Sequence, residues 1–323
     1  MRDKNIDAAR GIAIILVVMG HICTGIPGLV KWIYSFHMPL FFLISGYLQE
    51  GKEYGRFTSY LKKKAGALLY PYYIFAVLGT LGTVMYVRNR EVISQTIISR
   101  VFGITTESNA IGAIWFLMVL FEVEILDYAI VKVRQKWVVP ICGVIGSMLM
   151  AFSLEIPFMM HLTFTGIVFF NIGKLLKKHY RNFASSQNME CILIVFFWIL
   201  NVFSMIMNKR IDMYLFQYGN IALFWIESIS GSLGFIMSIL WIGGRYSWKW
   251  VDVIGKESLI IMAVHSYIHM IICAIGGKLL NISLECVLGN GIVGIVWSGI
   301  LVIMSYVIAK IIRKFFPFLI EPI

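Results

Sequence analysis

Long apolar runs separated by short polar segments recur from one end of the chain to the other. A bilayer core about 30 Å thick is crossed by a helix of about 20 mostly apolar residues. Runs of that length predict about ten transmembrane helices, at residues 6–25, 30–49, 67–87, 111–131, 138–153, 156–176, 191–207, 219–242, 257–276 and 290–311. The pattern therefore predicts an all-α, polytopic helical bundle. We expect it to form a single membrane domain over residues 1–323, without a separate soluble domain.

The basic residues give this bundle a direction. If the N-terminus is cytoplasmic, most of the 28 Lys and Arg residues fall in inner loops, as the positive-inside rule requires. Both chain ends are then predicted to be cytoplasmic. These short loops also account for the net charge of +11, which therefore does not indicate nucleic-acid binding. A composition of 59% hydrophobic and 14% charged residues excludes an ordinary soluble globular protein, and we expect a multi-pass membrane protein.

Arg10 and His21 lie in the first predicted span, with ten mostly apolar residues between them. A helix turns about 100° per residue, so eleven positions return the two side chains to nearly the same face, about 16 Å apart. An arginine inside a membrane is costly and is usually kept for a partner or a substrate pathway. This pair therefore predicts a polar site within the membrane.

His37 lies in the second predicted span, at a depth close to that of His21. Pro39 removes a backbone donor and is expected to kink this span beside His37. An imidazole is the usual side chain for moving a proton near neutral pH. For a lone histidine, a packed helix residue with one satisfied hydrogen bond is the more common explanation. Two histidines at matched depth, with an arginine on the same helix, favour a catalytic site.

A histidine that acts as a base needs a carboxylate to orient it. The candidates within the predicted spans are Glu122, Glu124, Asp127 and Glu227. Glu122 and Glu227 lie deepest, and Glu122 is the catalytic candidate, whereas Glu227 serves equally well as a structural partner. Glu124 and Asp127 approach the inner end, where solvation is the alternative. A zinc site on three histidines lacks a supporting HExxH motif or cysteine pair, so we expect no metal.

Three further segments contain candidates for binding. Trp115 begins the fourth span, where an aromatic residue is either an interface anchor or the wall of a sugar site. Lys256 directly precedes the ninth span and Ser258 lies at its start, where they meet an anionic ligand or simply cap a helix at the cytoplasmic edge. His265 lies near the middle of that span, and Ser45, in the second span, is a candidate donor to an oxyanion.

Four motifs, in this order along the chain, resemble the membrane-bound acyltransferase-3 family. They are Arg10-x10-His21, the segment SFHMPLFFLISGY at residues 35–47, WFL at residues 115–117, and Gly255-x-x-Ser258-Leu leading to His265. The resemblance extends over essentially the whole chain. It implies O-acyl transfer, usually of acetyl, from cytoplasmic acyl-CoA to a sugar hydroxyl, often in a surface polysaccharide. It also implies functional roles for Arg10 and His21, with His37, Glu122, Trp115 and Ser258 at matching positions.

The functional hypothesis is therefore a membrane-embedded O-acetyltransferase. Acetyl-CoA is the expected acyl donor, and the expected acceptor is a saccharide or a lipid-linked saccharide in contact with membrane lipid. Arg10 and Lys256 would meet the donor phosphates, while His21 or His37 acts as a general base. An acetyl-histidine intermediate is a variant of this mechanism. The alternatives are a transporter or flippase that uses the same residues as a substrate pathway, and a non-catalytic sensor module.

Overall fold

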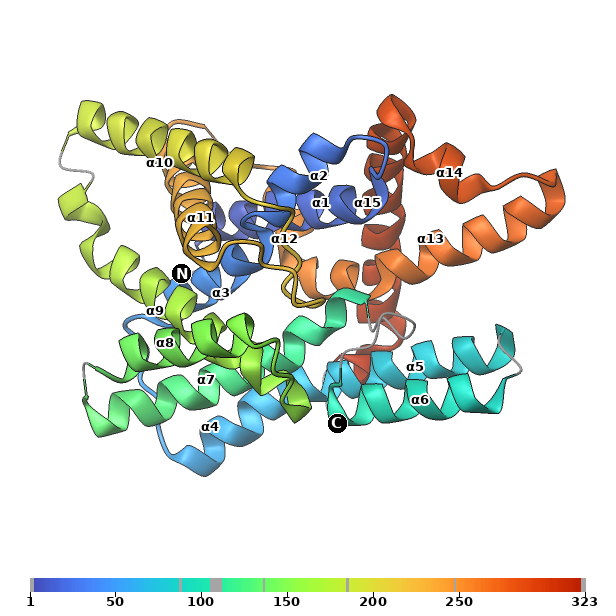
Figure 1. Ribbon diagram of the computed structural model, residues 1–323, viewed down its shortest axis with the longest axis horizontal. Helices are drawn as coiled ribbons and strands as arrows, with labels where there is room; N and C mark the ends of the chain where they lie inside the picture. Colours follow the sequence, from blue (N-terminus) through green and yellow to red (C-terminus); the bar gives the residue numbers. More distant parts are fainter. Residues whose placement is uncertain are drawn as a thin grey trace.

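The computed structural model describes residues 3–86, 89–104, 112–135, 137–183, 186–246 and 248–320 (Figure 1). Its α-helices are α1 (Lys4–Ile22), α2 (Pro27–Tyr34), α3 (His37–Gln49), α4 (Phe57–Lys64), α5 (Tyr70–Tyr86), α6 (Arg90–Phe102), α7 (Trp115–Val133), α8 (Val138–Ala151), α9 (Met160–Phe183), α10 (Gln187–Met207), α11 (Ile221–Gly243), α12 (Val251–Lys256), α13 (Ser258–Leu280), α14 (Leu284–Gly289) and α15 (Gly291–Phe315). A π-helical turn, Ala65–Leu69, joins α4 to α5. Within these residues the β structure is limited to one isolated bridge, between Asp212 and Gln217.

Each of the ten predicted spans overlaps helical segments in the described part of the chain, which confirms the all-α polytopic membrane fold. Among the described residues, eight helical segments are long and apolar enough to cross a membrane. The other two predicted spans are α8, which has only 14 residues, and α7, which carries three acidic residues. The structure also contains α6, a helix between the predicted third and fourth spans, which lies beside α5 (Figure 1).

The predicted kink beside His37 is a complete break between α2 and α3, and its position follows from Pro39. In a continuous helix, the N–H of residue 39 would donate to the carbonyl of Ser35, but proline has no N–H and its ring clashes with that carbonyl. The helix therefore stops at residues 35–36, and Phe36 adopts φ −146°. The Ser228 hydroxyl of α11 donates to the freed Ser35 carbonyl at 2.8 Å. The break is thus stabilised by a neighbouring helix.

Glycines allow two pairs of helices to approach at backbone contact. A Cβ added to Gly46 of α3 would lie 1.8 Å from the carbonyl oxygen of Phe170 in α9, and one added to Gly173 of α9 would lie 1.9 Å from that of Leu43. The same relation holds between α1 and α12, where a Cβ on Gly255 would lie 1.7 Å from the carbonyl oxygen of Asp7. Such close approach through small residues is the usual means of packing helices in a membrane.

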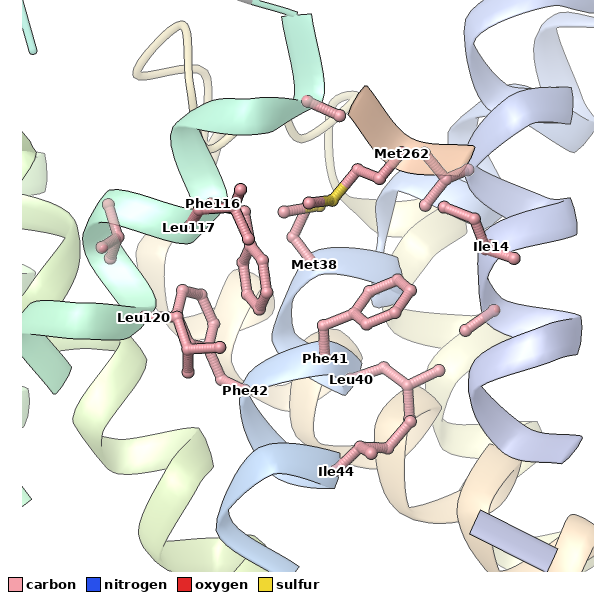
Figure 2. Close-up of a cluster of buried hydrophobic side chains, with 14 of the residues drawn as sticks. Ile14, Met38, Leu40, Phe41, Phe42, Ile44, Phe116, Leu117, Leu120 and Met262 are labelled. Carbon is pink, nitrogen blue, oxygen red and sulfur yellow. The ribbon is translucent and has the colours of Figure 1, made fainter. Parts of the chain in front are cut away.

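A cluster of large apolar side chains surrounds α3, which packs against α1, α9 and α11 and contacts α7 through aromatic side chains. Figure 2 shows Met38 and Phe41 of α3 between Phe116 of α7 and the side chains of α1 and α13, with Phe42 beside Phe116 and Leu120. Phe41 and Phe42 lie 5.7 and 4.8 Å from Phe116, measured between ring centroids. This packing holds α1, α3, α7 and α13 together next to the predicted histidine site.

The acidic residues near the predicted inner end of α7 are buried and paired, so the solvated alternative for them was wrong. Glu124 accepts a hydrogen bond from the Tyr60 hydroxyl at 2.8 Å and forms an ion pair with Lys64. Asp127 accepts from the Tyr54 hydroxyl and from Lys174, whose Nζ lies 2.9 Å from Oδ1. These contacts tie α7 to α4 and α9, and they account for charged residues inside an otherwise apolar bundle.

Candidate active site

His21 and His37 line one cavity of about 410 Å³, as the sequence predicts for residues at matched depth. His21 comes from the last turn of α1, and His37 from the first turn of α3. Tyr34, at the end of α2, lies between them, with its ring centroid 6.3 Å from that of His21 and 4.8 Å from that of His37. The described lining comprises His21, Tyr34, His37, Met38, Gly112, Ala113, Trp115, Asp212, Met213, Tyr214, Leu215 and Ser266.

The helix break determines which nitrogen of His37 is available. The Ile33 carbonyl, at the end of α2, lies 2.9 Å from His37 Nδ1. Because a carbonyl oxygen only accepts hydrogen bonds, Nδ1 must carry a proton. In the neutral ring, Nε2 then holds the lone pair, and the ring borders the cavity. A fixed tautomer with a basic nitrogen at a cavity is the arrangement required of a general base.

His265 supports the opposite side of His21. Its ring is fully buried and stands edge-on to His21, with 5.2 Å between the centroids. His265 Nδ1 donates to the Ile261 carbonyl at 3.0 Å, so its Nε2 accepts from the Ser266 hydroxyl at 3.1 Å. Both ring nitrogens of His265 are therefore hydrogen-bonded. Of His265 and Ser266, it is Ser266 that belongs to the described cavity lining.

Trp115 also lines the cavity, where it faces Tyr214 with 6.1 Å between the ring centroids and 31° between the planes. Tyr214 belongs to the segment that connects α10 to α11, residues 208–220, which we call the covering loop. No role for this loop was predicted from the sequence. Its aromatic and apolar stretch MYLFQY, unusual in an outer loop, is the signal that would have indicated a segment folded back onto the bundle.

The covering loop also supplies the carboxylate that lines the cavity, Asp212. Burial raises the pKa of Asp212 above its usual range, while the Leu215 backbone N–H and Arg210 partly oppose this rise. Arg210 Nη2 lies 3.8 Å from Asp212 Oδ2, and the guanidinium stacks over the Tyr34 ring at 4.2 Å. A cation, a carboxylate and an aromatic ring thus cover one edge of the histidine site.

Glu227, which the sequence left between catalytic and structural roles, anchors this loop. It is buried in α11 and accepts a hydrogen bond from Asn208 Nδ2. The same Asn208 amide donates to the Tyr218 carbonyl at 3.1 Å, and its Oδ1 accepts from the Asn220 N–H at 2.8 Å. Glu227 therefore holds both ends of the covering loop through one asparagine.

Glu122 and Ser45 lie outside the described cavity lining. Glu122 of α7 accepts a hydrogen bond of 2.5 Å from the Thr163 hydroxyl of α9. The Ser45 hydroxyl donates to the Phe41 carbonyl at 2.8 Å, one turn earlier in its own helix. Both side chains thus have a local partner, and the structure does not bring them to the histidines.

The three predicted donor-binding residues lie on segments that meet at the beginning of α1. Gly255 packs against the Asp7 backbone, one turn before Arg10, and Lys256 and Ser258 follow Gly255 directly. Lys256 is exposed and pairs with Asp252 at 3.2 Å. Glu257 lies between Lys256 and Ser258 in the sequence. It is buried and forms ion pairs with Lys310 and Arg313 of α15, at 3.0 Å each. This end of the bundle is therefore rich in cations and about 16 Å from His21 along α1.

A family model described as an acyltransferase domain matches residues 3–314. The chain belongs to the acyltransferase-3 family. This membership confirms the resemblance drawn from the four motifs and the acyltransferase class that it implied.

Two curated relatives of this acyltransferase-3 protein carry the same name. Over 133 residues it is 32% identical to nodulation protein NolL of Mesorhizobium japonicum, a match that covers 37% of this chain and 34% of the relative. Over 213 residues it is 26% identical to nodulation protein NolL of Sinorhizobium fredii, which covers 60% of this chain and 54% of the relative. The chain thus spans about a third and about half of these two relatives. No solved structure shows a significant match.

Proposed function

We propose that this acyltransferase-3 protein moves an acetyl group from cytoplasmic acetyl-CoA to a hydroxyl of a sugar, in a surface polysaccharide or its lipid-linked precursor. The observation that carries the proposal is the cavity in which His21, His37 and Trp115 converge from three helices. Its volume of about 410 Å³ lies within the range of small-ligand sites, and its wall combines aromatic faces with a few polar groups. The rhizobial relatives are consistent with a bacterial plasma-membrane protein.

His37 is the general base in this mechanism. Its Nε2 takes the proton of the acceptor hydroxyl while the oxygen attacks the thioester carbon of the donor. The tetrahedral intermediate then collapses, the carbon–sulfur bond breaks, and the CoA sulfur receives the proton from His37. The Ile33 carbonyl stabilises the N–H side of the ring throughout, so that the proton is exchanged only at Nε2.

His21 stabilises the charge that develops on the thioester oxygen. Its ring borders the same cavity, and His265 packs edge-on against it and limits its rotation. A donor that is already oriented toward a developing oxyanion lowers the barrier without reorganisation during the reaction. The fixed tautomer of His37 makes that residue the base. The other histidine at the cavity, His21, is therefore given the role of donor to the oxyanion.

The donor enters from the cation-rich end of α1. Arg10 and Lys256 meet its phosphates, since a guanidinium forms paired hydrogen bonds with phosphate oxygens and a lysine adds a point charge. Ser258, at the first turn of α13, adds a hydroxyl and a helix N-terminus, which also favour an anion. The extended pantetheine arm then follows α1 toward His21.

This division of roles predicts that donor binding and chemistry separate by mutation. Arg10→Ala should weaken the binding of acetyl-CoA by about 10- to 100-fold, because one or more charged hydrogen bonds are lost. His21→Ala should bind acetyl-CoA within about threefold of the wild type and yet lose at least about 100-fold in acetyl transfer. Binding is measured by calorimetry on purified protein, and transfer by the acceptor-dependent release of CoA thiol.

Arg56→Ala is the matched control, since Arg56 is an exposed arginine of a predicted inner loop outside the described cavity lining. Well-folded wild-type protein that fails to bind acetyl-CoA would contradict the proposal and favour a transporter. Full transfer activity in His21→Ala would contradict the role given to that histidine alone.

A further inference from the structure

Asp212 is the one carboxylate among the described residues that line the histidine cavity. It belongs to the covering loop and not to any of the predicted spans. The loop holds it in place through paired backbone hydrogen bonds between Asp212 and Gln217, of 2.6 and 2.9 Å. Asp212 has no role in the proposed acetyl transfer. It is nevertheless a fixed, mostly buried anion that lines the same cavity as the two histidines.

We propose that Asp212, together with Trp115 and Tyr214, forms the acceptor subsite, and that it selects a neutral pyranose with two neighbouring free hydroxyl groups. The proposal rests on the proposed acetyl transfer and specifies the class of acceptor. In this subsite the carboxylate accepts hydrogen bonds from the sugar hydroxyls, and the aromatic pair contacts the apolar face of the ring. A further hydroxyl of the same sugar is then presented to His37 Nε2.

The hydrogen bonds of Asp212 leave room for a ligand. Oδ1 accepts from the Leu215 backbone N–H at 3.2 Å, and the Tyr214 backbone N–H also donates to this carboxylate. Arg210 Nη2 stands 3.8 Å from Oδ2, which is too long for a hydrogen bond, and the guanidinium packs over the Tyr34 ring. A carboxylate has about four acceptor positions, so Asp212 retains capacity on the side of the cavity. Sugar hydroxyls are donors that match this capacity.

The aromatic pair provides the complementary apolar surface. Trp115 and Tyr214 are only 31° from parallel and both border the cavity that Asp212 lines. Aromatic walls with a small number of fixed polar groups are the usual composition of a site that orients one small ligand. The pair comes from α7 and the covering loop, so the subsite forms only when that loop is folded over the bundle.

The same carboxylate disfavours an acidic sugar. A uronate carboxylate only accepts hydrogen bonds, so it cannot replace a hydroxyl as donor to Asp212. Two carboxylates in a partly buried cavity also repel each other more strongly than they would in water. Discrimination between a neutral glycoside and its uronate therefore reports on Asp212 directly.

The test uses the full-length protein in liposomes with acetyl-CoA and two acceptors, a neutral methyl glucopyranoside and the corresponding methyl glucuronide. We expect Asp212→Asn to raise the KM for the neutral glycoside by about 10- to 100-fold, the loss associated with a charged hydrogen bond. The KM for acetyl-CoA should stay within about twofold. The preference for the neutral glycoside over the glucuronide should fall by at least about tenfold, which a merely structural role of Asp212 would not produce.

Gln217→Ala serves as the control, because Gln217 lies in the same loop, its side chain is exposed and its bonds to Asp212 are made by the backbone. An Asp212→Asn protein with unchanged acceptor KM and unchanged preference would overturn the subsite while leaving acetyl transfer intact. A wild-type protein that binds acetyl-CoA but acetylates neither glycoside would overturn the sugar acceptor itself, and the subsite with it.

Discussion

Replacement of His37 by alanine should lower kcat for acetyl transfer by about 100- to 10,000-fold, the range that general base catalysis contributes. The physical reason is the position of the ring, whose Nδ1–H is bound to the Ile33 carbonyl while Nε2 remains available at the cavity. Without that nitrogen, the acceptor hydroxyl must attack without transfer of its proton to a positioned base. The rate of CoA thiol release at saturating donor and acceptor measures the effect.

Addition of imidazole to His37→Ala should restore part of the lost rate, because the vacated site opens onto a cavity that can admit a small base. His269→Ala is the matched control, since His269 also lies in a membrane helix but pairs with Trp297 and lies outside the described lining. It should retain kcat within about threefold. An unchanged kcat in His37→Ala would mean that another group, such as His21, accepts the proton of the acceptor hydroxyl.

Replacement of Gly46 by leucine should destabilise the folded protein by about 3 kcal/mol or more, the upper range for overpacking a filled interior. Even a methyl group at this position would lie 1.8 Å from the Phe170 carbonyl oxygen, and a backbone atom cannot move aside as a side chain can. The α3 and α9 helices would separate, and the first turn of α3 carries His37. We therefore expect a marked loss of thermal stability and of activity together, measured by thermal unfolding and size-exclusion chromatography.

Gly299→Leu is the control for this change. Gly299 lies in α15, within another membrane-spanning helix, but a Cβ added there meets no atom within 4 Å. It should unfold within a few degrees of the wild type. Equal stability of the two variants would show that α3 and α9 can separate at little cost, contrary to the packing described here.

The sequence by itself determined the membrane class, the approximate positions of the spans and part of the site. Each span must hold about 20 apolar residues, so its presence is visible without any knowledge of neighbours. Arg10, His21 and His37 were recognisable for the same reason, because a polar side chain within such a run is costly and requires an explanation. Trp115 was a candidate through its place in a motif, either as an interface anchor or as the wall of a sugar site, and the structure places it at the cavity.

The break before α3 shows which features of the fold could be predicted from local sequence and which could not. Pro39 predicts a disturbed helix, because its missing N–H and its ring act on the carbonyl four residues earlier. That the freed Ser35 carbonyl would meet Ser228 of α11, and that the Ile33 carbonyl would fix the tautomer of His37, depended on how the chain folds. Ser35 and Ser228 are far apart in the sequence, and the bond from His37 to Ile33, four residues earlier, forms across the helix break, so residue spacing predicted neither bond.

Only the tertiary structure decided which carboxylate accompanies the histidines. Depth in a span favoured Glu122 and Glu227, but α7 turns Glu122 toward Thr163, and Glu227 is occupied by Asn208. The carboxylate at the cavity is Asp212, which lies in a connecting loop outside the predicted spans. A loop has no periodicity that predicts its direction, so its return across the bundle follows from buried contacts at its two ends and from the helices beneath it.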